Sequence, residues 1–204
     1  MLQENNYITA SCEISNHTIY KNREKVFENK DAALSDFLLS AYNHFDLKYP
    51  KFYKMDSLSK LGWFASEILL KDSFQFENYK AEEIGIVLAN SNSSLDTDLK
   101  YFESTKDFAS PSLFVYTLPN IVMGEICIKN KFKGENAFFI QENFDTNFVE
   151  QYVNNLVNNN ILQACICGWV DVLHENHEVL MFLVEKNNKN NAIPFTAANM
   201  NFKD

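Results

Sequence analysis

The sequence predicts an α/β fold, with helices on both faces of a five-stranded mixed sheet that is mostly parallel. Short apolar runs alternate along the chain with longer segments of helical periodicity, and this alternation is typical of parallel sheets covered by helices. The 204 residues suit one domain, and 46% hydrophobic with 22% charged residues is the ordinary globular mixture. We assign the domain to residues 1–186 and a weakly patterned tail to residues 187–204.

The predicted strands are short and rich in apolar or β-branched residues. They are Tyr7–Ile14, Glu83–Asn90, Ala137–Gln141, Ile161–Val170 and His177–Glu185. The third and fourth are continuous apolar runs, so we expect them to be buried on both faces. The last two can pair through a turn between Leu173 and Asn176. Residues 18–30 are polar and form a surface excursion or a short hairpin.

The predicted helices have apolar residues at helical spacing and recognisable ends. They are Asp31–Phe45, a helix opened by Asp56 or Ser57, Leu95–Phe102, Leu113–Phe132 and Asp145–Asn159. We expect Asp31, Asp56 and Asp145 to be N-caps. The fourth helix is entered by Ser110-Pro111 and closed by Gly134. Between the second strand and the third helix, residues 91–94 form a Ser/Asn-rich loop whose backbone amides can hold an anion, although turn formation is favoured.

The charge of the chain limits its partners. The net charge is −9 with a pI of about 5.0, which argues against nucleic acid. Lys129, Lys131 and Lys133 form the only obvious basic cluster, and we favour a helix C-terminal role for them over the docking of an acidic partner. No run reaches the ~18 apolar residues of a membrane span, and the first residues lack the pattern of a signal peptide. We therefore expect a cytoplasmic protein.

The cysteines and histidines suggest neither a metal site nor a cofactor. All four cysteines lie in apolar runs, as buried reduced thiols do, and no second pair at zinc spacing completes Cys165 and Cys167. His174 and His177, with neighbouring Glu175 and Glu178, fit neither one helical face nor one strand face, so we expect solvated turn residues.

One stretch of the chain carries a family resemblance. Its pieces are Ser110-Pro111, Leu118-Pro119-Asn120, Gly124, Lys133-Gly134-Glu135-Asn136, and a strand that ends at Gly168 before Asp171. Together they resemble the N-terminal half of β-ketoacyl synthases (3-oxoacyl-ACP synthases) of the thiolase superfamily. The resemblance covers Tyr7 to Glu185 and implies a single thiolase-like half-domain.

The resemblance also implies that the chain lacks the family's nucleophile. In the family, the turn after the short strand carries a catalytic cysteine at the tip of the next helix. The elbow here is Gln141, Glu142, Asn143 and Phe144, and the ungapped count from Gly134 or Gly168 places Asn143 at the nucleophile position. The family's two histidines lie in a second half that these residues do not include. No catalytic residue is intact, and we expect a plugged elbow without condensing activity of its own.

Two surfaces follow from the resemblance. The partner-contact or acyl-tunnel residues are Phe114, Val115, Thr117, Leu118 and Asn120, and the dimer strand is Asn136, Ala137, Phe138, Phe139 and Ile140. The first hypothesis is a non-catalytic subunit, similar to chain-length factors, that pairs with a full-length ketosynthase. Its implied context is a fatty-acid or polyketide-type pathway, such as aryl polyene or flexirubin pigment synthesis.

Two alternatives remain open. One is a free-standing homodimer that binds an acyl chain or an acyl carrier protein without chemistry. The weaker one is a hydrolase that uses Glu142 or Asp145 at the helix tip.

Overall fold

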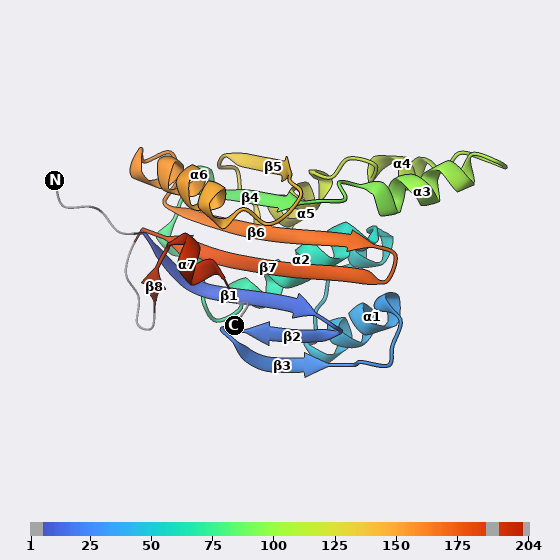
Figure 1. Ribbon diagram of the computed structural model, residues 1–204, viewed down its shortest axis with the longest axis horizontal. Helices are drawn as coiled ribbons and strands as arrows, with labels where there is room; N and C mark the ends of the chain where they lie inside the picture. The colour runs from blue at the N-terminus through green and yellow to red at the C-terminus, as the bar shows by residue number, and fades with distance from the viewer. Residues whose placement is uncertain (1–5, 187–191, 202–204) are drawn as a thin grey trace.

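The computed structural model describes residues 6–186 and 192–201, which form one sheet with helices on both faces (Figure 1). The strand order is β3-β2-β1-β7-β6-β4-β5, and β8 pairs with β1. The strands are β1 (Tyr7–Ser15), β2 (Thr18–Lys21), β3 (Glu24–Glu28), β4 (Ile84–Asn90), β5 (Asn136–Ile140), β6 (Ala164–Leu173), β7 (Asn176–Glu185) and β8 (Ile193–Pro194). The predicted α/β class with a mixed sheet is confirmed.

The number and direction of the strands differ from the prediction. All five predicted strands are present as β1, β4, β5, β6 and β7, but a β2–β3 hairpin and β8 extend the sheet to eight strands. Only the β4–β5 and β4–β6 pairs are parallel among the described strands, and the other pairs are antiparallel. The antiparallel pairing in the middle of the sheet follows from the tight β6–β7 turn. A short hairpin places β7 antiparallel beside β6, and β1 then pairs with β7.

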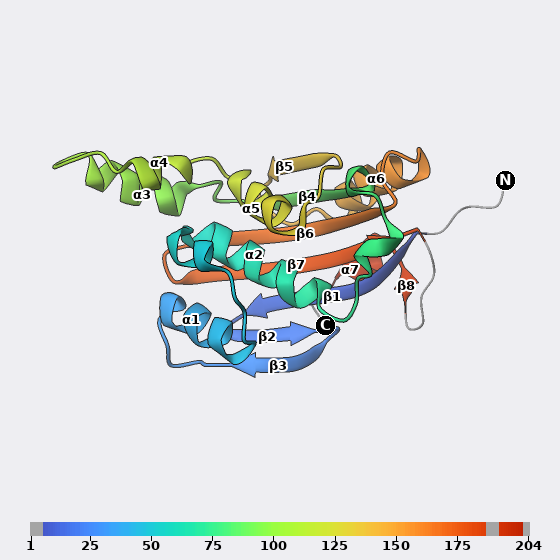
Figure 2. The same cartoon turned by 180° about the vertical axis from the view of Figure 1, so that it is seen from behind.

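The helices divide between the two faces of the sheet. They are α1 (Leu34–His44), α2 (Ser57–Leu70), α3 (Leu95–Ser104), α4 (Pro111–Val115), α5 (Ile121–Asn130), α6 (Thr146–Asn158) and α7 (Ala197–Met200), with short 3₁₀ helices η1 (Pro50–Lys54), η2 (Phe76–Asn78) and η3 (Ala81–Glu83). Helices α1, α2 and α5 pack on one face and bury the larger core (Figure 2). Helices α6 and α7 cover part of the other face over a smaller core. Among the described helices, none lies over the rest of that face (Figure 1).

The long helix predicted from Leu113 to Phe132 is wrong. The chain instead forms α4, a turn, and α5, and the break falls at Pro119. Proline has no backbone N–H and its ring clashes with the preceding turn of a helix, so it stops α4 from running into α5. The break turns α4 away from the sheet, whereas α5 packs against α2 with Val122 and Ile126 fully buried.

Two of the three predicted N-caps are confirmed. Asp56 accepts a hydrogen bond from the Ser59 backbone N–H at 2.9 Å, and Asp145 accepts one from the Phe148 N–H at 2.9 Å. Asp31 does not cap α1, which begins only at Leu34. The Leu34 N–H donates instead to the Glu175 carboxylate, 2.7 Å away on the β6–β7 turn. A long-range carboxylate thus replaces the local cap.

Strand β5 is not buried on both faces, contrary to the prediction. It lies at the end of the sheet with β4 as its sole neighbour in the described structure, and its end residues Asn136 and Ile140 are exposed. The predicted strand Ile161–Val170 also shifts, since β6 begins at Ala164. The apolar composition is the same for a central strand and for an edge strand that a partner covers, so sequence alone does not separate the two.

The described part of the tail packs on the body. β8 pairs with β1, and Phe195 and Met200 are buried beside α6. The Ala197 N–H donates to the Glu150 carboxylate of α6 at 2.6 Å. In the described ranges, no helix has the length and apolar character needed to cross a membrane.

Candidate functional site

The elbow is held at both ends. On one side, the Gln141 N–H donates to the Asn90 carbonyl of β4 at 2.9 Å, which continues the β4–β5 ladder. On the other, Asp145 caps α6. Glu142 and Asn143 lie exposed between these two points, at the carboxyl end of β5 and beside the N-terminus of α6. This is the position where open α/β sheets hold their ligands.

The neighbouring β4–α3 loop binds a carboxylate of the protein itself. Asp171, on β6, accepts hydrogen bonds from the Ser91 N–H at 3.2 Å, the Asn92 N–H at 3.0 Å and the Asn92 side-chain amide at 2.6 Å. The Ser91 hydroxyl donates a further bond at 3.2 Å. The amides of this loop do hold an anion, as the sequence allowed, but the anion is Asp171. The loop is therefore fixed in position.

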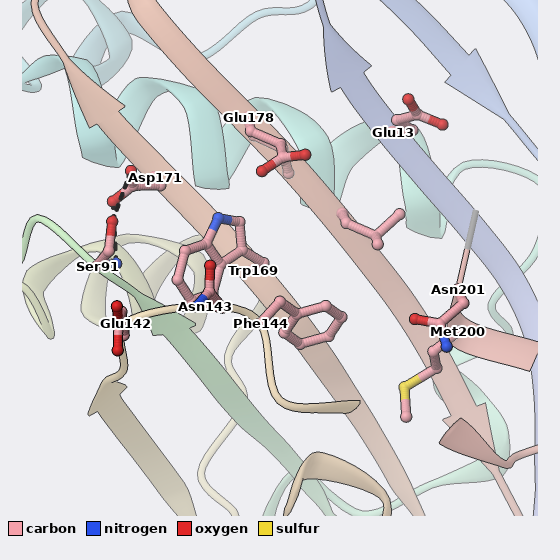
Figure 3. Close-up of a pocket in the computed structure, with 12 residues that line it drawn as sticks. Glu13, Ser91, Glu142, Asn143, Phe144, Trp169, Asp171, Glu178, Met200 and Asn201 are labelled. Atoms are coloured by element: carbon pink, nitrogen blue, oxygen red, sulfur yellow. Dashed lines mark hydrogen bonds between the residues drawn. The ribbon is translucent and has the colours of Figure 1, made fainter. Parts of the chain in front are cut away.

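A cavity opens beside the elbow. Its volume is about 370 Å³, and it is bordered by the elbow, the ends of β1, β6 and β7, and helix α7 (Figure 3). Phe144 and Trp169 lie next to each other on its wall with ring centroids 6.0 Å apart. The elbow was expected to be plugged, but Glu142, Asn143 and Phe144 border an open space.

The elbow offers no thiol for acyl transfer. Asn143 stands at its tip, and an amide cannot form a thioester. Cys165 and Cys167 are fully buried on β6, where burial raises the pKa of Cys165 to about 12 and that of Cys167 well above its ordinary value. Cys127 is half-buried on α5, and burial raises its pKa as well. None of these thiols is activated as a catalytic cysteine would be.

Helices α3 and α4 form an arm, defined here as residues 95–120, that projects beyond the sheet (Figure 1). The two helices are joined by a contact between the rings of Tyr101 and Phe114, whose centroids are 5.4 Å apart, and by the Ser110 N–H, which donates to the Ser104 hydroxyl. The arm exposes large apolar side chains: Leu95, Leu99, Phe102, Phe108, Phe114, Val115 and Leu118. Of the predicted contact residues, Asn120 is also exposed and Thr117 is half-buried.

Acidic groups fix the root of the arm. Asp96, which is 2% exposed at the start of α3, accepts the His174 N–H at 3.0 Å and pairs with Lys100 at 2.6 Å. The Thr97 hydroxyl donates to Asp56 at 2.7 Å, so the cap of α2 also anchors α3. The start of α3, from which the exposed apolar side chains of the arm project, is therefore held by hydrogen bonds and an ion pair.

A buried cluster anchors the other end of the arm. Glu125 of α5 is 3% exposed, and its carboxylate lies 2.7 Å from the Lys51 ammonium of η1. The Tyr116 hydroxyl, just after α4, donates to Glu125 at 3.1 Å. Burial and the adjacent Glu125 carboxylate raise the pKa of Tyr116 well above its usual range. The cluster could not be predicted from the sequence, because no local motif joins its three members.

The basic cluster on α5 is already engaged. Lys129 pairs with Glu67 at 3.8 Å, and Lys133 pairs with Glu82 at 3.9 Å. Lys131 is the left-handed C-cap of α5. These positions agree with the helix-end role favoured by the sequence. In the described residues, no group of three or more His, Cys, Asp or Glu side chains is placed to hold a metal ion.

No protein-family model matches the sequence, and no curated protein matches it. Solved structures do match. The ishigamide ketosynthase/chain length factor aligns with a TM-score of 0.65 and 14% identity, over 89% of this chain and 62% of that chain. The fold is that of a ketosynthase half-domain. The structure of a type II PKS acyl-carrier protein in complex with its ketosynthase aligns with a TM-score of 0.61 and 13% identity, over 90% of this chain and 62% of that chain.

A ketosynthase in complex with its chain length factor from Xenorhabdus doucetiae is also similar, with a TM-score of 0.57 and 10% identity, over 90% of this chain and 79% of that one. The chain thus spans about 62% of the length of the first two matched structures and more of the third. At these identities, the ketosynthase-like fold is what the similarity establishes.

Proposed function

We propose that the protein is a cytoplasmic, non-catalytic ketosynthase-like subunit that pairs with an active ketosynthase and shapes its acyl tunnel. The observation that carries the proposal is that an unpaired edge strand and a set of exposed apolar side chains lie along one long edge of the molecule. The edge strand β5 and the apolar arm both lie along this edge in two opposite views (Figures 1 and 2). The family resemblance puts Asn143, in the elbow beside this edge, where a condensing enzyme needs a thiolate, so a partner would supply the chemistry.

The two ends of the sheet differ in a way that supports pairing through β5. The end strand β3 carries Glu24, Lys25 and Glu28, and Lys25 pairs with Glu28 at 2.6 Å. Charges of this kind discourage the addition of another strand. The sequence of β5, Asn-Ala-Phe-Phe-Ile, carries no charge. One end of the sheet is therefore protected and the other is free to pair.

The hydrogen-bond pattern shows which groups of β5 are free. The Ile86 N–H donates to the Glu135 carbonyl, and the Gln141 N–H donates to the Asn90 carbonyl. Because the backbone groups of a strand alternate between its two sides, the even-numbered residues Asn136, Phe138 and Ile140 direct theirs away from β4. A partner strand can bond to them without disturbing the sheet.

The arm supplies the apolar part of the proposed interface. Phe114, Val115 and Leu118 are 60%, 50% and 57% exposed. Side chains of this size, inserted beside a growing acyl chain, discriminate length by steric exclusion at about 1–3 kcal/mol per mismatched methylene. The similar structures include a ketosynthase in complex with its chain length factor, which supports a ketosynthase as the partner. A fatty-acid or polyketide-type pathway, including aryl polyene or flexirubin pigments, remains the proposed context by analogy.

The test is co-expression of the tagged protein with candidate ketosynthases, followed by co-purification and size-exclusion chromatography. Ile140→Pro removes one outward N–H and leaves the β4–β5 bonds in place, so we expect about tenfold or greater loss of affinity. Phe114→Asp, on the arm, should also weaken binding. Leu39→Asp, at an exposed apolar position on α1 outside β5 and the arm, is the control.

Functional outcomes separate the candidate roles. With carrier-bound malonyl and acyl substrates, we expect condensation only when the partner is present, and a product-length change in Phe114→Ala. A stable homodimer that binds no ketosynthase would replace this proposal with the homodimeric acyl-chain or acyl-carrier-protein binding protein. Condensation or hydrolysis by the protein alone would contradict a non-catalytic role.

A further inference from the structure

The cavity beside the elbow is strongly acidic. Its lining residues include the carboxylates Glu13, Glu142, Asp171 and Glu178 and no lysine or arginine. Asp171 is occupied by the loop at Ser91 and Asn92, and Glu13 accepts the Ser15 hydroxyl at 2.8 Å. In the described structure, Glu142 and Glu178 are exposed and have no ion-pair partner. Two carboxylates are therefore free to meet a cation in the cavity.

Trp169 adds a hydrogen-bond donor to the wall of the cavity. Its side chain is 5% exposed, yet its indole N–H has no acceptor among the described residues. Figure 3 shows the indole nitrogen directed into the space near Asp171 and Glu178. The open cavity allows a bound molecule to supply that acceptor.

The remaining walls combine the polar residues Ser91, Asn143 and Asn201 with apolar side chains. Phe144 packs beside Trp169, and Leu180 and Met200 complete the lining next to them. These side chains suit a hydrocarbon or aromatic body, and the indole face favours a nearby cation. The cavity volume of about 370 Å³ suits a small organic molecule.

We infer that this cavity binds a small organic amine, with its ammonium group at Glu142 and Glu178, its apolar body against Phe144 and Trp169, and a hydrogen-bond acceptor for the indole N–H. The same carboxylates repel anionic ligands, so a phosphate-bearing group is disfavoured here. The inference stands on the lining of the cavity and does not require the proposed pairing with a ketosynthase.

Three small molecules of similar shape but different charge test whether the cavity prefers a cation. Tyramine carries an ammonium group, tyrosol carries a neutral hydroxyl in its place, and 4-hydroxyphenylacetate carries a carboxylate. All three have an aromatic body and a phenolic oxygen. Binding is followed by isothermal calorimetry on the full chain at low salt, and by tryptophan fluorescence, since Trp169 lines the cavity and the other tryptophan, Trp63, is fully buried. We expect tyramine to bind about tenfold more tightly than tyrosol, and the acid not at all.

Substitutions in the cavity lining test whether the probes bind there. Glu178→Gln removes an exposed charge without touching the core and should bring tyramine close to tyrosol in affinity. Trp169→Phe should weaken both and abolish the fluorescence change. Glu77→Gln, an exposed glutamate on η2 outside the cavity lining, is the control and should change neither. Equal affinity for tyramine and tyrosol, unchanged binding in Glu178→Gln, or no saturable binding of tyramine would overturn the inference.

Discussion

Replacing Lys51 by methionine should leave the Glu125 carboxylate buried without its counter-charge. The Glu125 side chain is 4% exposed and lies 2.7 Å from the ammonium, whereas the Lys51 side chain is 41% exposed. At an effective dielectric constant of about 20, the gross attraction at this distance is about 6 kcal/mol. The cost of desolvating the Lys51 ammonium offsets part of this attraction. In addition, no donor lies in good hydrogen-bond geometry to Glu125 Oε2.

The net effect should be a loss of about 3 kcal/mol. This is the low end of the range for breaking one side of a buried ion pair, because the Tyr116 hydroxyl still donates to Glu125 at 3.1 Å. In urea unfolding, the midpoint should fall by about 1 M with an unchanged slope. The double variant Lys51→Met/Glu125→Met removes the isolated charge and should be more stable than Lys51→Met alone.

The control is Lys133→Met. Its partner Glu82 is 3.9 Å away and both side chains are about two-thirds exposed, so the expected loss is under about 0.5 kcal/mol. If Lys51→Met destabilises the protein no more than Lys133→Met does, the buried Lys51–Glu125 pair does not stabilise the fold, and the reasoning is refuted.

Three further predictions concern single positions. Gly168 has φ near +150°, and an added Cβ would lie 2.0 Å from the Leu180 carbonyl oxygen, so Gly168→Ala should cost about 3 kcal/mol or more in chemical unfolding. Burial lowers the pKa of His177, so the folded state favours the neutral ring. Stability should therefore fall as pH drops below about 6.5, and His177→Gln should flatten that part of the pH–melting profile; an identical slope in both would contradict this. Iodoacetamide should modify half-buried Cys127 first in the native protein, whereas prior unfolding should be needed for the fully buried Cys12, Cys165 and Cys167, as peptide mass spectrometry can check.

Local patterns were sufficient for most elements. The apolar spacing between Asp145 and Asn159 predicted α6, and a capping carboxylate is a local signal, so Asp56 and Asp145 were placed correctly. Local patterns failed where a partner was distant in sequence. Asp31 was chosen as a cap because Glu175, the residue that bonds to Leu34, lies 141 positions away.

The candidate site was predicted only in part. Counting along the chain from Gly134 and from Gly168 puts Asn143 at the family's nucleophile position, and this placement stays a prediction. The binding of Asp171 by the β4–α3 loop could not be predicted, because the bond joins residues 79 or 80 positions apart. The cavity and its acidic lining arise only when β1, β6, β7 and α7 meet beside the elbow.

By itself, the sequence determined the order and type of the main elements and the absence of a thiol at the elbow, because periodicity, capping and residue identity are local properties. Tertiary structure decided which strand lies at the edge of the sheet, that α4 and α5 separate at Pro119 into arm and body, and that the elbow faces open space. Those features depend on which surfaces meet and which remain unpaired, and a strand such as β5 has the same composition whether its neighbour belongs to the same chain or to another.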